Sequence, residues 1–246
     1  MSSVLRVRNV FKHFGGIKAL NNCSLEIEKG KIIAIIGPNG SGKSTLFNVI
    51  SNLISGDKGS VNLEGENITS LNDFKIARMG ISRTFQEVRL FKNLSIKDHL
   101  EIARGNGDEK LFGSLFGKKT LDDEKVLEVL GLVGLEKPLE TFASDLSYGQ
   151  RKLLDLAVAI AKPHKILMLD EPVAGINPKL REEIKKILKN LNKKQKETIL
   201  LIEHDMNFVM DLADYVYVLD EGRVIASGTP KQIQRNKKVL EAYLGE

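Results

Sequence analysis

Short runs of apolar residues stand out along the chain, and each is followed by a turn and then by a helical pattern. These runs are Ile32–Ile36, Ile166–Leu169 and Ile199–Ile202. Short apolar runs between turn signals are typical of strands buried on both faces, and strands that alternate with helices form a parallel sheet covered by helices. The pattern therefore predicts an α/β fold with a parallel core sheet.

Other strand-like segments have alternating or hairpin character. They are LRVRNVFKHF from Leu5, NNCSLEIEKG from Asn21, GSVNLEGENI at residues 59–68, and the pair YVYVLDEGRVIASG from Tyr215. Alternation of apolar and polar residues indicates half-buried strands, which commonly pair antiparallel. We expect these segments to form an antiparallel β layer beside the parallel core.

Helical patterns dominate between Asn93 and Ala161, where strand signals vanish. Apolar residues recur every three or four positions in DDEKVLEVLGLVGL (122–135) and in YGQRKLLDLAVAIA (148–161), which is the spacing of an amphipathic helix. We therefore expect one domain over residues 1–246, with a core at 1–86 and 162–246 and an α-helical subdomain at about 87–161.

Composition favours a globular chain without nucleic-acid partners. The 246 residues are 42% hydrophobic and 28% charged, and 37 Lys plus Arg face 32 Asp plus Glu. The basic residues are scattered among acidic ones, which is typical of a mixed-charge surface and not of a nucleic-acid-binding face. No stretch approaches the roughly 18 apolar residues of a membrane span, and the first residues lack a secretory signal, so we expect a soluble chain. The single cysteine, Cys23, is expected to fill the core.

A glycine-rich phosphate loop follows the first buried strand. Residues 37–45 read GPNGSGKST and match the pattern G-x-x-x-x-G-K-[ST] between a strand and a helix. Glycines let successive N–H groups turn toward phosphate oxygens, Lys43 brings a positive charge to the β and γ phosphates, and Ser44 offers Mg²⁺ a hydroxyl. The expected nucleotide contacts are Gly37, Pro38, Asn39, Gly40, Ser41, Gly42, Lys43, Ser44 and Thr45.

The strand KILMLDE ends in two carboxylates, Asp170 and Glu171. Charge at the end of a buried strand is costly unless it meets a cation or a reacting group. Downstream of a phosphate loop, Asp170 suits the coordination of Mg²⁺, and Glu171 suits the general base that polarises an attacking water.

A phosphate loop and an acidic strand would also fit a nucleoside kinase or a GTPase, and LSYGQ at residues 146–150 decides between the classes. Together with the two earlier motifs and a late histidine, it resembles the C motif of ATP-binding-cassette (ABC) proteins, and the resemblance covers nearly the whole chain. Phe14 matches the aromatic residue that stacks on adenine, Gln86 the Q-loop glutamine, and His204 the switch histidine.

The resemblance implies a P-loop NTPase (RecA-like) fold, ATP and Mg²⁺ as cofactors, and a site shared by two ATP-binding subunits. Ser147, Gly149 and Gln150 would contact the nucleotide held by the other subunit, which is a second copy or a paralogue, so that dimerisation depends on ATP. The implied roles are catalytic for Glu171, His204, Gln86 and Lys43, and metal-binding for Ser44, Gln86 and Asp170.

Departures from the family pattern point to a subfamily. Tyr148 stands where the family usually has glycine, and Asn177 in EPVAGINP stands where aspartate is common. With IARMGISRTFQEVRLFKNLSI and the ending EAYLGE, these stretches look like the ATP-binding subunits of branched-chain amino acid importers. Such subunits lie at the cytoplasmic face of the cell membrane, drive membrane permease subunits and act indirectly with a substrate-binding protein.

The resemblance leaves several points open. The segment RLFKNL at residues 89–94 would line the groove for a short permease helix, whereas LFGSLFGKK at 111–119 is equally compatible with that contact and with ordinary packing. The alternative functions are a cassette of another transporter, such as a lipopolysaccharide exporter, and a soluble cassette ATPase outside transport.

Overall fold

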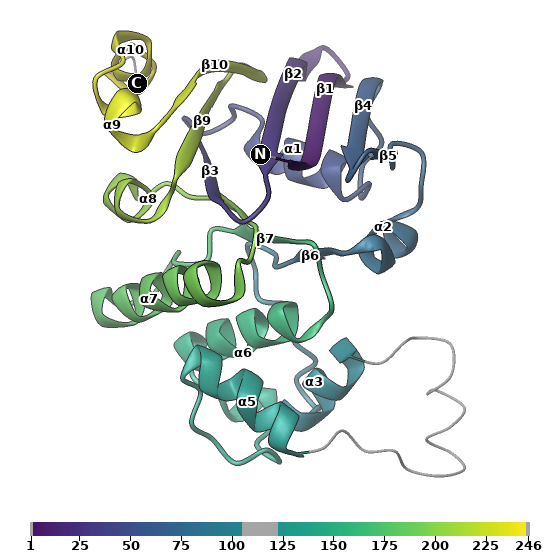
Figure 1. Ribbon diagram of the computed structural model, residues 1–246, viewed down its shortest axis with the longest axis vertical. Coiled ribbons are helices and arrows are strands. Elements are labelled where there is room, and N and C mark those ends of the chain that lie inside the picture. Colours follow the sequence, from purple (N-terminus) through teal and green to yellow (C-terminus); the bar gives the residue numbers. More distant parts are fainter. Residues whose placement is uncertain (1, 105–122, 245–246) are drawn as a thin grey trace.

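The computed structural model describes residues 2–104 and 123–244, so residues 111–119 lie outside the described part. Its centre is a six-stranded sheet (Figure 1). The strand order is β10 (Arg223–Gly228), β9 (Tyr215–Asp220), β3 (Ile32–Ile36), β8 (Ile199–Ile202), β7 (Ile166–Asp170) and β6 (Ile81–Arg83). All neighbours pair in parallel except β10 with β9. Every residue of β3, β7 and β8 is buried, as their apolar runs predict.

A separate antiparallel sheet covers one side of this core (Figure 1). Its order is β2 (Ile17–Glu28), β1 (Ser3–Phe14), β4 (Lys58–Leu63) and β5 (Glu66–Asn67). Helix α1 (Lys43–Ile50) contributes Leu46, Phe47 and Ile50 to a hydrophobic cluster that joins residues of both sheets. The predicted parallel core with an antiparallel layer is therefore confirmed.

The prediction was wrong for the pair β9–β10, which we expected in the antiparallel layer. The two strands do pair antiparallel with each other, but β9 also pairs in parallel with β3 and so extends the main sheet. The chain reaches β9 from β8 through helix α8 (Met206–Leu212), and such a helical crossover returns the next strand in the same direction.

The helices of the middle segment lie together in the lower part of the molecule (Figure 1). They are α3 (Ile96–Arg104), α5 (Asp123–Val133), the 3₁₀ turn Ala143–Asp145, and α6 (Tyr148–Ala161). A second hydrophobic cluster runs from the main sheet, through α6, into α5. The other helices of the described part of the chain are α2 (Asp73–Met79), α7 (Pro178–Gln195), α8, α9 (Pro230–Gln234) and α10 (Lys237–Leu244).

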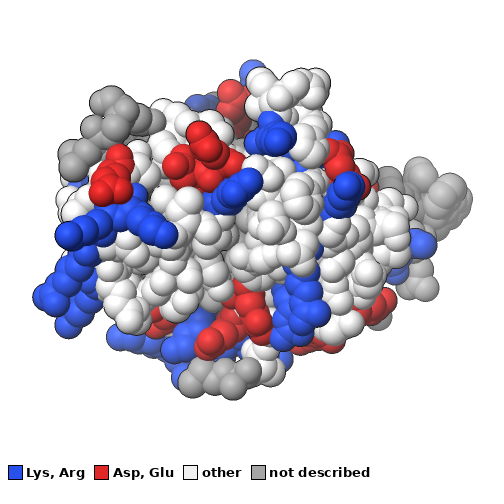
Figure 2. Space-filling model, turned by 90° about the horizontal axis from the view of Figure 1, so that it is seen from above, with Lys and Arg blue, Asp and Glu red and all other residues white. Residues whose placement is uncertain are grey.

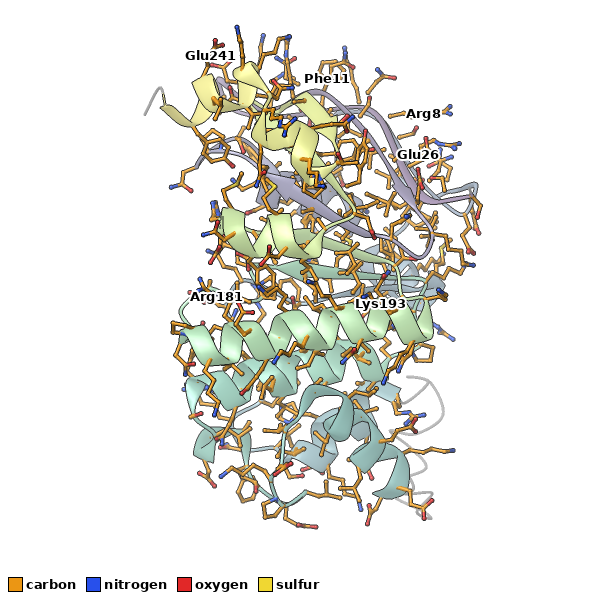
Figure 3. The ribbon with its side chains drawn as sticks, turned by 60° about the vertical axis from the view of Figure 1, so that its left-hand side comes forward. Arg8, Phe11, Glu26, Arg181, Lys193 and Glu241 are labelled. Atoms are coloured by element: carbon orange, nitrogen blue, oxygen red, sulfur yellow. The ribbon has the colours of Figure 1, made fainter. Side chains whose placement is uncertain are left out.

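Local signals explain where α6 and α7 begin. Ser147 and Gln150 form a reciprocal capping box at the start of α6. Asn177 caps α7 through its side chain, which accepts from the Leu180 N–H at 2.9 Å, and Pro178 occupies the first turn. Helix α7 crosses the molecule with Arg181 near one end and Lys193 near the other (Figure 3).

The charged residues on the face drawn in Figure 2 are of both signs and are interspersed with uncharged ones. No helix among residues 2–104 and 123–244 is both long and apolar enough to span a membrane. Cys23 is fully buried, and burial raises the pKa of its thiol to about 12, so it packs in the core as expected.

Leu188 of α7 offers a direct test of this packing because it is completely buried, whereas Leu127 of α5 is 54% exposed. Replacing Leu188 by Ala should lower the free energy of unfolding by about 2–5 kcal/mol, because apolar contacts are lost and a cavity remains. The control Leu127→Ala should change it by no more than about 0.5 kcal/mol. Urea unfolding measures both values, and equal losses would contradict the assigned burial.

Candidate nucleotide-binding and hydrolysis site

The phosphate loop is wedged between backbone atoms of neighbouring strands. A Cβ atom added to Gly37 would lie 2.0 Å from the carbonyl oxygen of Leu219, and one added to Gly42 would lie 2.3 Å from that of Ala19. Both glycines also have positive φ angles, 149° and 102°. Only glycine fits these two positions, so the course of the loop is fixed by β9 on one side and β2 on the other.

The loop leads directly into α1, whose first turn has no side-chain cap and no acidic residue. Its N–H groups and the positive end of the helix dipole are therefore available to an anion. Lys43 is 5% exposed, and its Nζ donates to the carbonyl oxygens of Gly37 and Pro38, both at 2.8 Å. The ammonium group thus lies inside the curve of the loop. Ser44, Asn39 and Gly40 are exposed, Thr45 is half-buried and Ser41 is buried.

Asp170, at the end of β7, forms a buried ion pair with Arg83. Its Oδ2 accepts from Arg83 Nη2 at 3.0 Å, and its Oδ1 is buried without a hydrogen-bond partner among the described residues. Burial raises the pKa of this carboxyl, and Arg83 opposes the rise. A free buried carboxylate oxygen fits a water ligand of Mg²⁺, a cation that retains several waters in nucleotide sites.

Gln86 and His204, which come from different sequence motifs, both contact the carboxylate of Glu171. Glu171 Oε1 lies 2.7 Å from His204 Nε2, and Glu171 Oε2 accepts from Gln86 Nε2 at 3.1 Å. Gln86, Glu171 and His204 each follow the carboxyl end of a strand, namely β6, β7 and β8, and these ends lie along one edge of the parallel sheet. Three residues that are far apart in the sequence therefore lie close together in the structure.

The backbone of Glu171 is itself strained. Glu171 has φ = 49°, in the left-handed region that costs a non-glycine residue about 1 kcal/mol or more. Its N–H donates to the Ile202 carbonyl at 3.0 Å, which anchors the turn to β8. Such strain is typical of sites where a side chain must be held in one direction.

Sequence reasoning missed two buried charged residues that hold this cluster. Lys152 of α6 donates from Nζ to the carbonyl oxygens of Gln86 and Glu171, both at 3.2 Å, and burial lowers its pKa. Glu203 accepts from the backbone N–H groups of Val173 and His204 at 3.0 and 3.1 Å, and burial raises its pKa. A charged residue within the apolar pattern of α6, or at the end of β8, is the signal that could have revealed them.

The C motif lies apart from the phosphate loop of the same chain. Ser147, Gly149 and Gln150 start α6 in the lower part of the molecule, whereas α1 lies in the upper part (Figure 1). They border a hollow of about 670 Å³ that also includes Asn177. None of the described residues that line this hollow belongs to the phosphate loop of the same chain.

Tyr148 connects the C motif to the turn before α7. Its hydroxyl donates to the Ala174 carbonyl at 3.4 Å, and a Cβ added to Gly175 would lie 3.4 Å from its ring. The ring is 42% exposed. The unusual tyrosine therefore packs against the turn before α7 of its own chain and also lines the hollow beside the C motif.

Phe14 ends β1, opposite Ile17 at the turn of the β1–β2 hairpin. Phe14 is 45% exposed, and Lys12 Nζ lies 5.3 Å from the centre of its ring. An exposed aromatic face of this kind is suited to stacking. Its stacking on adenine stays a prediction.

Comparison with known families agrees with this arrangement. The family model "ABC transporter" matches residues 20–174, and the model "Branched-chain amino acid ATP-binding cassette transporter" matches residues 223–246. The chain belongs to the ABC transporter family, as an ATP-binding cassette.

The chain is similar to transport ATP-binding subunits over nearly their full length. The chain is 38% identical to the high-affinity branched-chain amino acid transport ATP-binding protein LivG of Salmonella typhimurium, covering 99% of this chain and 98% of that protein. It is 39% identical to the probable LivG of Archaeoglobus fulgidus, covering 98% and 95% of the two chains.

Solved structures of cassettes have the same fold. A nucleotide-free ATP-binding cassette from an ABC transporter matches with a TM-score of 0.85 and 35% identity over 100% of both chains. A dimeric cassette in a post-hydrolysis state, bound to ADP and phosphate, matches with a TM-score of 0.78 and 28% identity over 92% of this chain and 98% of that one. The chain is accordingly an ATPase, and cassettes of this family dimerise.

Lys152 tests how the site is held together. Replacing it by Met should lower the free energy of unfolding by about 1–3 kcal/mol, because two partly buried carbonyl groups lose their donor. Lys186→Met, at an exposed position of α7, is the matched control and should have an effect below about 0.5 kcal/mol. Urea unfolding compares the two variants, and equal stabilities would show that the Lys152 contacts contribute nothing.

Proposed function

We propose that the chain is the ATP-hydrolysing subunit of an importer for branched-chain amino acids, bound peripherally at the cytoplasmic face of the membrane. The observation that carries the hydrolytic role is the meeting of Gln86 and His204 at the Glu171 carboxylate, at the same edge of the sheet as Asp170. The substrate class is supported by the full-length similarity to LivG proteins and by the match over residues 223–246.

The phosphate loop binds ATP through the residues expected from the sequence. The β and γ phosphates meet the loop N–H groups, Lys43 and the start of α1, where positive charge is concentrated. Phe14 stacks on the adenine. Ser44, Gln86 and Asp170 would hold Mg²⁺, and the bound cation would neutralise the negative charge that develops on the phosphates. Asp170 has one oxygen, Oδ1, without a hydrogen-bond partner among the described residues.

Glu171 orients and polarises the attacking water as a general base. In the described structure its two oxygens are bound to His204 and Gln86. Hydrolysis therefore requires these two side chains to turn toward the nucleotide: His204 toward the γ phosphate, and Gln86 toward the metal and the water. The strained backbone of Glu171 keeps its carboxylate directed toward this edge of the main sheet while His204 and Gln86 turn away from it.

The second half of the site comes from another ATP-binding subunit. The start of α6, with Ser147, Gly149 and Gln150, binds the γ phosphate on the partner's loop. The capping box already engages the N–H groups of Ser147 and Gln150, and it leaves the Gly149 N–H for the phosphate. The hollow of about 670 Å³ beside this motif leaves the helix start accessible to that partner. ATP thus joins the two subunits, and loss of the γ phosphate releases them.

The permease docks beside the Q-loop. Leu90 and Lys92 border a hollow of about 700 Å³ that begins at Gln86, and Phe91 is 64% exposed next to it. An apolar and basic rim of this kind suits a short amphipathic helix. Because Gln86 belongs to both the hollow and the catalytic cluster, docking there acts directly on hydrolysis.

Replacing Glu171 by Gln should preserve ATP binding and lower hydrolysis by roughly 10²- to 10⁴-fold, because the general base is lost while the phosphate loop stays intact. Glu128→Gln, at an exposed position of α5, is the control and should hydrolyse ATP at the wild-type rate. Phosphate release and equilibrium ATP binding measure the two effects. Near-normal turnover of the Glu171 variant would exclude Glu171 as the base.

ATP should convert the Glu171→Gln variant from monomer to dimer, because the uncleaved γ phosphate is needed to bridge the two subunits. Sedimentation velocity with and without ATP measures the change. The double variant Lys43→Ala/Glu171→Gln should stay monomeric, since its loop no longer holds the phosphates. If the chain pairs only with a paralogue, the dimer should form on mixing with that paralogue. An association state independent of ATP in both cases would contradict the proposed bridge.

Co-purification from its own cells tests the transport role. An importer subunit should be recovered with a permease for branched-chain amino acids. Recovery with an exporter would favour a lipopolysaccharide-type cassette, and recovery without any membrane protein would favour a soluble cassette ATPase.

A further inference from the structure

We propose that Arg83 is a positioning residue that orients Asp170 toward the bound metal–nucleotide complex. Arg83 is the last residue of β6, and its side chain crosses to the end of the neighbouring strand β7. There its Nη2 donates to Asp170 Oδ2 at 3.0 Å. The two side chains are only 7% and 5% exposed, so water does not compete with this contact.

The guanidinium group is held by contacts on its other sides. Its Nη1 donates to Ser51 Oγ at 2.8 Å, and Ser51 in turn donates to the Phe47 carbonyl at the end of α1. The rings of Phe47 and Phe85 lie 5.4 and 5.1 Å from the guanidinium carbon. Arg83 is therefore anchored to the helix that follows the phosphate loop and to the segment that leads into Gln86.

The Arg83–Asp170 ion pair is better explained by the orientation it gives to Asp170 than by a contribution to the stability of the fold. A buried ion pair gains little net stability, because desolvation of the two charges offsets their attraction. Here the group is also incompletely satisfied, since Arg83 Nε is buried without a hydrogen-bond partner among residues 2–104 and 123–244. Its two Nη contacts nevertheless fix a planar group with a defined direction, which a flexible ammonium group could not reproduce.

As a result, the two carboxylate oxygens of Asp170 differ in their hydrogen-bond partners. Oδ2 is occupied by Arg83, and Oδ1 is left buried and free, at the sheet edge where Glu171 follows. Arg83 thus selects the oxygen that faces the metal and prevents the carboxylate from rotating. Residues behind a metal ligand commonly act in this way, and their loss costs about 10- to 100-fold in metal affinity.

This inference rests on the proposed Mg²⁺ role of Asp170, and equilibrium binding can test each part separately. ATP affinity is measured calorimetrically in EDTA and in excess Mg²⁺, in the Glu171→Gln background, in which hydrolysis is expected to be roughly 10²- to 10⁴-fold slower. In the reference protein Mg²⁺ should tighten ATP binding. Arg83→Met should bind ATP in EDTA within about twofold of the reference but should lose about tenfold or more of the Mg²⁺-dependent tightening.

Further variants separate positioning from folding. Arg83→Lys should recover part of the Mg²⁺ response, because Lys can reach one of the two partners, and Ser51→Ala should give a smaller loss in the same direction. Arg6→Met, which breaks an exposed ion pair with Glu26, is the matched control and should respond like the reference. If Arg83→Met does not fold, the Lys and Ser51 variants decide the question.

A Mg²⁺ response equal to that of the reference in Arg83→Met, or in both Arg83→Lys and Ser51→Ala, would overturn the assignment of Arg83 alone. Absence of any Mg²⁺ effect in the reference protein, or an unchanged effect in Asp170→Asn, would instead refute the proposed metal role of Asp170 on which the inference rests.

Discussion

The tight packing of the glycine loop between β3 and α1 is the constraint on which the rest of the site depends. Backbone oxygens of Ala19 and Leu219 lie where side chains of Gly42 and Gly37 would have to be. The two flanking strands, β2 and β9, therefore fix the loop with no freedom to collapse. Lys43 and the uncapped start of α1 are presented together as a consequence, and a triphosphate is the ligand that uses both.

Gln86, Glu171 and His204 come together because β6, β7 and β8 run parallel. Strands β6, β7 and β8 deliver these residues to one edge of the sheet, and two buried charged residues, Lys152 and Glu203, hydrogen-bond to the backbone around them. Lys152 comes from α6, the helix that the C motif begins. A shift of α6 would consequently reach Gln86 and Glu171 of the same chain through one ammonium group.

Local features of the sequence predicted much of this structure. The apolar runs located β3, β7 and β8, and the helical periodicity of residues 148–161 located α6 at Tyr148–Ala161. The placement of β9 failed because the choice of a pairing partner depends on tertiary packing and not on alternation. Arg83 went unnoticed because its partner Asp170 is 87 positions away and no local pattern links them.

The central claim is that one ATP is bound by the loop of one chain and by the C motif of another. A crystal structure of the Glu171→Gln variant with Mg²⁺ and ATP, with its paralogue if one is required, tests this most directly. The account predicts a γ phosphate that contacts Lys43 of one subunit and the Ser147 helix start of the other. If the ATP in the crystal contacted one chain only, while the same protein bound ATP in solution with unchanged affinity, the result would contradict this claim.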